Sequence, residues 1–566
     1  MLNGGVILDR VKKIKNESEA KSFTTGVMVL SLSTLIVKII GLAFKIPMLS
    51  FLGAEGMGYF NSAYEIYALL CVVSTAGLPV ALSMLVSSAR ARCDTYGVRS
   101  VFKSARRLFW AIGAAGTFGM IFFASRLSAF IGNPQAYLSI LAIAPALLFI
   151  CLASAARGYC QGFGDMTPTA VSQLIEAVAK LGLGILFAVI AIKNGYEIFA
   201  VAAFATLGIT MGTLLSLIYL SFAMRKHTRT LEKTESTEKS PRYCATKELA
   251  RIAFPITLGS LLMGLTRIID MTLIMRRLQD IGVSVAESNK IYGAYTTLAV
   301  PVFSLIPALI TPVSLALIPS LTAARERGDG LAQRSVSENA MRLTTVFAMP
   351  ASLGLAVFSQ QTLELLFSSQ NEAIDICAPL LSILGISVVF SCLITTTNAI
   401  LQSYRRVFLP IISMGIGVVI KLAVSYALIG DARFGALGAP IGSLCCAIAA
   451  TALNIYFMRR EARECFSVKN VFFKPLAASA VSVAVAIATY LGVTRFGGAY
   501  FSLMISVSVA AVGYFCVSLL IGSINAEDLA SVPIINRFSN RMNKKRKRDK
   551  NDCSGKEKTV ARKGKL

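Results

Sequence analysis

The sequence predicts an all-α polytopic membrane protein, and three observations support this fold class. The chain has 566 residues, 55% of them hydrophobic and only 15% charged, whereas a soluble domain has about a quarter charged residues. Its apolar residues gather in continuous runs of about 20 or more, the length that a helix needs to cross a bilayer. Continuous runs, in contrast to short alternating segments, favour helices over a closed barrel.

Hydropathy divides the chain into fourteen transmembrane spans, which place both termini on the same side of the membrane. Most of the 56 Lys and Arg residues then lie on that side. Arg157, which lies at the end of a predicted span, is counted with them. The positive-inside rule therefore predicts that both termini are cytoplasmic. The predicted spans are 24–46, 59–86, 108–131, 137–158, 169–192, 198–223, 249–275, 291–319, 343–368, 377–401, 408–430, 435–458, 472–494 and 500–522.

Two parts of the chain resemble each other. The segment "PVALSMLVSSARAR" from Pro79 is similar to "PVSLALIPSLTAARER" from Pro312, and a Gln-to-Lys spacing that ends at Lys180 recurs with its end at Lys421. Each repeat holds six spans, an even number, so both enter the membrane from the same side and are parallel repeats. We expect two six-helix lobes around a central cleft, with spans 13 and 14 outside the repeat.

This reading gives the domain organisation. The segment between the lobes is charged and rich in Ser and Thr, so we expect it to be flexible. The C-terminal tail contains "KKRKRDK" and is expected to rest on anionic lipid headgroups. The predicted parts are a cytoplasmic N-terminus (1–22), a first lobe with spans 1–6 (23–224), a cytoplasmic linker loop (225–247), a second lobe with spans 7–12 (248–460), spans 13 and 14 (461–522) and a basic cytoplasmic tail (523–566).

The composition excludes several classes of function. The net charge of +26 follows the membrane topology, so it predicts contact with lipid headgroups and no nucleic-acid partner. A single histidine, His227, and 12 cysteines without metal spacing argue against a metal or His-based catalytic site. The chain lacks G-x-x-x-x-G-K-[ST], so ATP does not drive it directly. The predicted external loops are short. We therefore expect neither an enzyme nor a bound cofactor.

Charged residues deep in the predicted spans are the candidate functional residues, because such residues are costly in a membrane. Arg267 and Asp270 are three residues apart, and Glu176 and Lys180 are four apart, so each pair shares a helix face. Each can be a structural ion pair or part of a functional site, and the spacing leaves both open. The full set is Lys38, Lys45, Glu65, Glu176, Lys180, Arg267, Asp270 and Lys421.

Lys38 and Lys45 are the strongest candidates. Seven residues separate them, about two helical turns, so both project from one face of the first span. Glu65 is the single acid in the next span and can neutralise only one of them. Lys45 lies near the span end, where it either reaches the outer headgroups or binds a ligand, whereas Lys38 is deeper. Two ammonium groups facing a water-filled cleft would bind an anion such as a phosphate.

The eighth span is also unusual. Proline removes a backbone hydrogen bond and bends a membrane helix. We expect a strongly bent helix that either lines the cleft or serves packing. Its prolines are Pro301, Pro307, Pro312 and Pro319.

Several segments identify a family. "KIIGLAFKIPMLSFLGAEGMGYFNSAYEIYALL", "STAGLPVALS", "IYGAYTTLAVPVFSLIPALITPVSLALIPSLTAA" and "NAILQSYRR" resemble the multidrug/oligosaccharidyl-lipid/polysaccharide (MOP) exporter superfamily. Within it, they are similar to the polysaccharide-biosynthesis branch of stage V sporulation protein B and the MurJ-like lipid II flippases. The resemblance extends over 23–522.

The resemblance implies a flippase for an undecaprenyl-pyrophosphate-linked sugar, with lipid II as first choice, in the cytoplasmic membrane. It implies alternating access, a lipid-tail groove formed with spans 13 and 14, and a drive from the membrane potential or a Na⁺ or H⁺ gradient. For the oligomeric state, we expect a monomer. Lys38 matches a basic position of the flippases, whereas their second position is Phe44 here, with Lys45 one residue later. Their eighth-span arginine has no counterpart, and Arg267 would supply that charge.

The proposed substrate ligands are thus Lys38, Lys45 and Arg267, and the other five charges are cavity or coupling residues. A cation-coupled multidrug exporter of the same fold is the alternative. Such an exporter needs acids in its cleft, whereas the first-lobe cleft predicted here is basic, which favours an anionic cargo. A polymerase or transferase needs a large external loop or a catalytic motif, and the sequence has neither. The cargo stays open among lipid II, a teichoic or capsular precursor and a spore-specific product.

Overall fold

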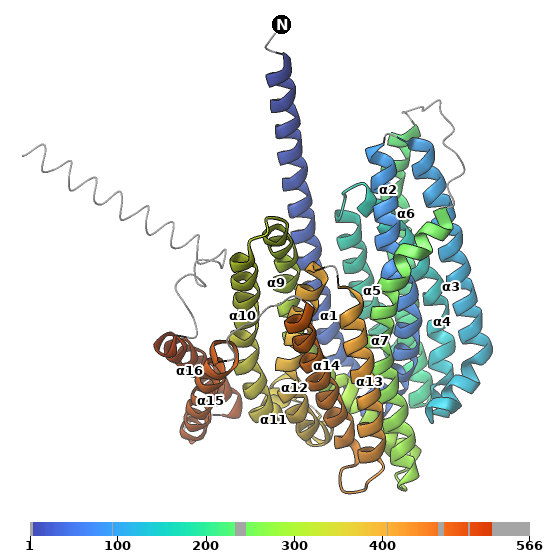
Figure 1. Ribbon diagram of the computed structural model, residues 1–566. Helices are drawn as coiled ribbons and strands as arrows, with labels where there is room; N and C mark the ends of the chain where they lie inside the picture. Colours follow the sequence, from blue (N-terminus) through green and yellow to red (C-terminus); the bar gives the residue numbers. More distant parts are fainter. Residues whose placement is uncertain are drawn as a thin grey trace, which may run out of the picture.

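The computed structural model describes residues 4–92, 94–232, 245–368, 370–404, 406–461, 469–495 and 498–522. These residues form helices and short connections, with no strand among them. The prediction of an all-α membrane protein with two lobes and two additional C-terminal helices is confirmed (Figure 1). Residues 523–566, the predicted basic tail, lie outside the described residues.

Six long helices form the first lobe. They are α1 (Gly4–Thr75), α2 (Gly77–Ala91), α3 (Thr95–Ile131), α4 (Tyr137–Gly162), α5 (Thr167–Lys193) and α6 (Ile198–Glu232), with a 3₁₀ turn η1 (Pro134–Ala136) before α4.

The second lobe and the C-terminal pair combine long helices with several short ones. They are α7 (Ala245–Asp280), α8 (Val285–Ala294), the π-helix η2 (Tyr295–Ala299), α9 (Val300–Glu326), α10 (Gly330–Val357), α11 (Ser359–Leu366), α12 (Asn371–Ser403), α13 (Phe408–Ile429), η3 (Gly435–Leu437), α14 (Gly438–Glu461), η4 (Lys469–Phe473), α15 (Lys474–Val493) and α16 (Ala499–Ile521).

Helices α1 and α2 together contain two membrane crossings. Thirteen stretches of the described chain are long and apolar enough to cross a membrane, and the first, Ile36–Arg90, has 55 residues. One crossing needs only about 20 residues, so this stretch holds two. They are separated at Gly53, whose φ of 64° and ψ of −178° are accessible to glycine and strained for other residues. The fourteen predicted spans are thus accounted for.

The two lobes repeat the same packing. In the first lobe α4 and α5 both pack on α6, and in the second lobe α12 and α13 both pack on α14. Gly208 of α6 lies against the Gly184 backbone of α5, and Gly417 of α13 lies against Cys446 of α14. Small residues let membrane helices approach closely. This equivalence agrees with the internal repeat that the sequence predicted.

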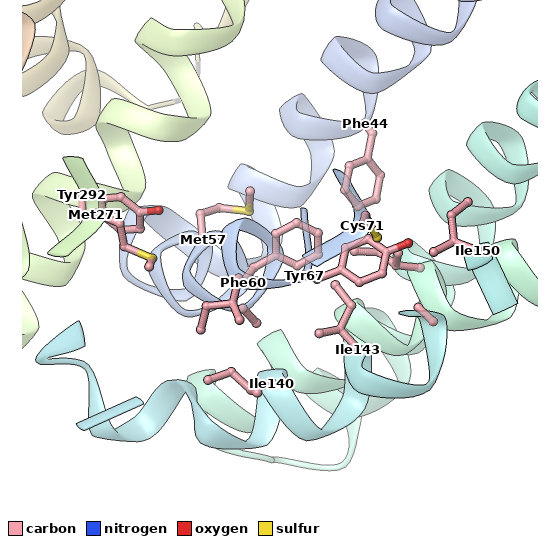
Figure 2. Close-up of a cluster of buried hydrophobic side chains, with 14 of the residues drawn as sticks. Phe44, Met57, Phe60, Tyr67, Cys71, Ile140, Ile143, Ile150, Met271 and Tyr292 are labelled. Carbon is pink, nitrogen blue, oxygen red and sulfur yellow. The ribbon is translucent and has the colours of Figure 1, made fainter. Parts of the chain in front are cut away.

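The lobes meet through α1 and α2 of the first lobe and α7 and α8 of the second. A continuous hydrophobic core crosses this junction (Figure 2). Met57 and Phe60 of α1 lie in it with Ile140 of α4, while Met271 and Tyr292 enter from the second lobe. Helices α15 and α16 pair with each other and stand beside α10 at the edge of the molecule (Figure 1).

The loop between the lobes is shorter than predicted. Helix α6 continues to Glu232 and α7 begins at Ala245, so both helices extend into the range 225–247 assigned to the linker. Polar residues continue these helices because, beyond the bilayer, helix formation no longer depends on apolarity. Residues 233–244 lie outside the described part of the chain.

Candidate functional site

The eight predicted intramembrane charges come from both lobes. Lys38, Lys45 and Glu65 lie on α1, and Glu176 and Lys180 lie on α5 of the same lobe. The remaining three are on α7 and α13 of the second lobe, namely Arg267, Asp270 and Lys421.

Asp270 and Lys421 form a buried ion pair within the second lobe. The Lys421 ammonium donates to Asp270 Oδ2 at 2.7 Å, and only 5% of the lysine side chain is exposed. The pair joins α7 to α13. Lys421, which has no acid in its own span, thus finds one on a neighbouring helix. Since each charge neutralises the other away from water, the pair is a structural link between these helices.

Arg267 pairs with the opposite lobe. Its Nε lies 3.4 Å from Glu65 Oε2, and its side chain stays 44% exposed. The intrahelical pair of Arg267 with Asp270, which their spacing had suggested, does not form, because each residue has a partner on a different helix. Arg267 therefore carries an accessible charge at the junction of the lobes.

Glu176 also has a different partner from the one its spacing suggested. Arg157 of α4 donates to Glu176 Oε2 at 2.8 Å and to the hydroxyls of Ser172 and Ser216 at 3.0 Å each. This role of Arg157 was not predicted, because the residue lies at the end of a predicted span and was assigned to the charges of the cytoplasmic side. The polar residues Ser172 and Ser216 on neighbouring spans were the available signal.

Lys180 is left with aromatic partners. Its ammonium lies 4.4 Å from the ring centre of Tyr64 and 5.6 Å from that of Phe44. Among the described residues, no carboxylate lies within ion-pair distance of it. Cation–π contacts of this kind hold an ammonium group in place while its positive charge remains uncompensated.

Lys45 links the lobes. Its ammonium donates to the main-chain carbonyl of Thr296 in η2 at 2.6 Å. The sequence explains why no backbone N–H donates to this carbonyl. The Val300 N–H is directed to Tyr295 O in the π-helix, and the next residue, Pro301, has no N–H to donate. Lys45 therefore points into the protein, and it does not reach the outer headgroups.

Lys38 differs from Lys45 although both lie on α1. Its side chain is exposed, and within the described part of the chain it has neither an ion pair nor a hydrogen bond. The tertiary structure thus separates the two lysines into an accessible one and one engaged between the lobes.

Polar side chains close the junction at the distal end, which we define as the end of the bundle that α1 reaches at Gly53. Asn61 of α1 donates to the hydroxyls of Thr296 and Thr297 at 2.9 and 2.8 Å. Asn133 donates to Asn289 at 2.7 Å, and Asn289 donates to a carbonyl of α1 at 2.8 Å. We call these bonds the distal seal.

An apolar groove of about 610 Å³ lies between the second lobe and the C-terminal pair. Its walls come from α10, α15 and α16, and Gly354 of α10 leaves open space within it. Spans 13 and 14 thus form a groove, as the family resemblance implied. Lining residues include Val346, Pro350, Ala486, Val507, Ala510 and Tyr514.

The described residues contain no group of three or more His, Cys, Asp or Glu side chains suited to a metal ion. The chemistry at the junction of the lobes is instead that of ammonium and guanidinium groups. It can bind and release an anion by charge and hydrogen bonding.

The fold with two six-helix lobes is the fold of solved membrane transporters of the MOP superfamily. The structure is similar to lipid II flippase MurJ in an inward closed conformation, with a TM-score of 0.66 and 15% identity over 87% of this chain and 98% of that one. It is also similar to an inward-facing multidrug resistance MATE family transporter of the same superfamily, with a TM-score of 0.61 and 15% identity over 77% and 98% of the two chains.

Sequence comparisons place the chain more narrowly. It belongs to the polysaccharide biosynthesis protein family, whose model matches residues 23–324. It is 25% identical to stage V sporulation protein B of Bacillus subtilis, over 74% of this chain and 80% of that protein. It is 28% identical to lipid II flippase MurJ of the same organism, over 71% and 77% of the two chains. The chain is thus a flippase or transporter of the MOP superfamily.

Proposed function

We propose that the protein flips an undecaprenyl-pyrophosphate-linked oligosaccharide, lipid II first, across the cytoplasmic membrane. The observation that carries this proposal is the excess of cations over acids on α1 and at the junction of the lobes. Lys45 is bonded to a neutral carbonyl, Lys38 has no acidic partner among the residues described, and Arg267 keeps an accessible side chain. The Lys45 ammonium is half-buried and has no counter-ion of its own. Such a group is costly, and an anionic cargo would supply the missing counter-ion.

The acids support an anionic cargo over a cationic drug. Glu65 is paired with Arg267, Glu176 with Arg157, and Asp270 with Lys421. Each carboxylate is thus neutralised within the protein. An exporter of cationic drugs would need a carboxylate that is free to meet its cargo.

The groove beside α10 supports a lipid-linked cargo. Its walls are almost entirely apolar side chains, and it lies apart from the charged residues on α1 and α7. A polyprenyl tail could occupy such a groove while its diphosphate lies between the lobes. The name of one relative, lipid II flippase MurJ, points to the same class of substrate.

The lobes would alternate their access to the two sides of the membrane by breaking and reforming the distal seal. The seal consists of hydrogen bonds between neutral groups, and the lysine–carbonyl bond of Lys45 lies beside it. These bonds can be exchanged for bonds to water at modest cost. We place both termini in the cytoplasm on the charge distribution of the sequence.

Reconstitution tests this function. Proteoliposomes with fluorescent lipid II should show protein-dependent flipping, and Lys38→Ala and Lys45→Met should slow it. Ethidium efflux from the same vesicles is the comparison. Ethidium transport without movement of lipid II or another undecaprenyl-linked glycan would replace this proposal with the multidrug exporter.

A further inference from the structure

We propose that Lys180 of α5 is a second ligand for the diphosphate and forms, with Lys45, a two-cation subsite on the first-lobe side of the junction. This inference rests on the proposed function and extends it to a helix outside the first span. The Lys180 ammonium lies over the rings of Phe44 and Tyr64, both on α1. Phe44 directly precedes Lys45, and the two ammonium groups are near enough to repel each other.

The aromatic contacts hold Lys180 without neutralising it. A ring face stabilises an ammonium group but accepts none of its positive charge. Lysine has three N–H donors, and no hydrogen bond from Lys180 Nζ to another described residue is present. Its side chain is half-buried. The group is therefore positioned, and its donors remain available to the oxygens of a ligand.

The nearby acids do not compensate Lys180. Glu176, one helical turn away, accepts a hydrogen bond from Arg157, whose guanidinium is also held by two serine hydroxyls. Glu65 attracts Lys45 but is paired with Arg267. Both carboxylates therefore have a cation closer to them than Lys180.

The repeat offers an internal comparison. Lys421 occupies the equivalent place in the second lobe, and a carboxylate 2.7 Å away neutralises it. Lys180 has no such carboxylate among the described residues. If Lys180 served packing alone, we would expect a carboxylate beside it, as Asp270 lies beside Lys421 in the second lobe. The difference between the lobes points to a counter-ion that comes from outside the protein.

The charges at the junction match a diphosphate. Lys45 and Arg267 share a single carboxylate, Glu65. Lys180 has none within ion-pair distance among the described residues. The other two ion pairs are neutral in themselves. The junction thus carries a surplus of two positive charges. A diphosphate that is esterified at both ends carries one negative charge on each phosphate. Two separate lysines suit two phosphates, since lysine binds phosphate as a compact charge.

The test measures discrimination between one and two phosphates. Binding of lipid II, whose diphosphate is esterified at both ends, and of undecaprenyl monophosphate to the purified full chain is measured by native mass spectrometry. Flipping of fluorescent lipid II is measured in proteoliposomes. Lys180→Gln should weaken diphosphate binding roughly tenfold, the usual effect of losing a charge-assisted hydrogen bond, and leave monophosphate binding nearly unchanged. Lys180→Arg should restore much of the diphosphate preference.

Lys193→Gln is the matched control, because Lys193 is an exposed lysine at the end of the same helix. It should bind and flip like the wild type. Equal diphosphate binding by Lys180→Gln and the wild type, with wild-type flipping, would overturn the subsite and leave the flippase intact. A wild-type protein that neither binds the diphosphate nor flips lipid II would instead overturn the proposed function. An equal loss for both lipids, or a lowered Tm in Lys180→Gln, would assign Lys180 a structural role.

Discussion

Lys45 of the first lobe donates a 2.6 Å hydrogen bond to the main-chain carbonyl of Thr296 in the second lobe. The bond exists because Pro301 leaves that carbonyl without a backbone donor. Asn61 binds the hydroxyl of the same threonine. A proposed substrate ligand is therefore part of the contact that closes the distal end. A diphosphate that attracts Lys45 would compete with the Thr296 carbonyl and weaken this contact.

Removing the side-chain bonds of Asn61 should favour opening of the distal end. Asn61→Leu removes two buried hydrogen bonds, together worth about 2 kcal/mol, or roughly thirtyfold in the ratio of closed to open molecules. Spin labels at positions 194 and 285, on opposite lobes, should report a longer distance in a functional cysteine-free background.

The control for this change is Asn454→Leu. Asn454 is equally buried and makes two similar bonds, but both stay within the second lobe. It should lower stability and leave the distance between the labels unchanged. Identical distances in Asn61→Leu and the wild type would show that these bonds do not control opening.

Gly293 should be intolerant of a side chain for a geometric reason. A Cβ at this position would lie 2.6 Å from the Gly58 nitrogen and 3.0 Å from its Cα, both in the main chain of the opposite lobe. Neither atom can rotate away, so Gly293→Ala should prevent closure and stop flipping. A cysteine at Ser62, which is fully buried, should become reactive toward an impermeant thiol reagent.

Gly182→Ala is the matched control, since a Cβ there meets no atom within 4 Å. It should flip lipid II normally and keep the cysteine at position 62 protected. If the cysteine at position 62 stayed unreactive in Gly293→Ala, the distal end would still close. The close approach of the two helices at Gly293 would then not limit closure.

Breaking the Asp270–Lys421 pair should destabilise the second lobe. Lys421→Met leaves a buried carboxylate uncompensated, which costs about 3–5 kcal/mol. Combining Asp270→Asn with Lys421→Met should cost less than the sum of the two single changes, because the double variant leaves no buried charge without a partner. The thermal midpoint of unfolding of each variant in detergent measures these losses of stability.

The exposed pair of Asp431 and Arg433 provides the comparison for the buried one. Arg433→Ala should leave the thermal midpoint unchanged, because solvent screens this pair. Equal midpoints for Lys421→Met and the wild type would show that Asp270 is satisfied without Lys421.

Filling the apolar groove should affect long lipids selectively. Gly354→Leu places a side chain in open space of the groove. Flipping of lipid II with a full undecaprenyl tail should therefore fall roughly tenfold, the effect expected when a methylene group of the ligand no longer fits an apolar pocket. An analogue with a short tail should flip as before.

Gly415→Leu serves as the control, because position 415 is also open but lies on α13, outside the groove. It should flip both lipids normally. An equal loss for long and short tails in Gly354→Leu would indicate a folding defect and remove the groove from the tail-binding proposal.

Hydropathy alone predicted most of this fold. Runs of apolar residues specify crossings, because backbone groups without hydrogen bonds are too costly in the bilayer and each run must therefore form a helix. The even number of crossings in each repeat predicted that the two lobes are parallel. The loop around 225–247 was placed less well, since the ends of α6 and α7 extend into polar sequence. The sequence also identified the members of the ion pairs inside the spans except Arg157, which lies at a span end and pairs with Glu176 within the first lobe.

The pairing of these charges was decided by the tertiary structure. Spacing along one helix suggested Arg267 with Asp270 and Glu176 with Lys180, but neighbouring helices provide the carboxylates and cations that meet at closer range. An intrahelical pair gains only about 0.2–0.5 kcal/mol, whereas a buried charge gains far more from a partner that replaces its lost water. The distribution of apolar residues along the sequence thus determines which charges lie in the membrane. The packing of α1, α4, α5, α7 and α13 determines which of these charges are neutralised.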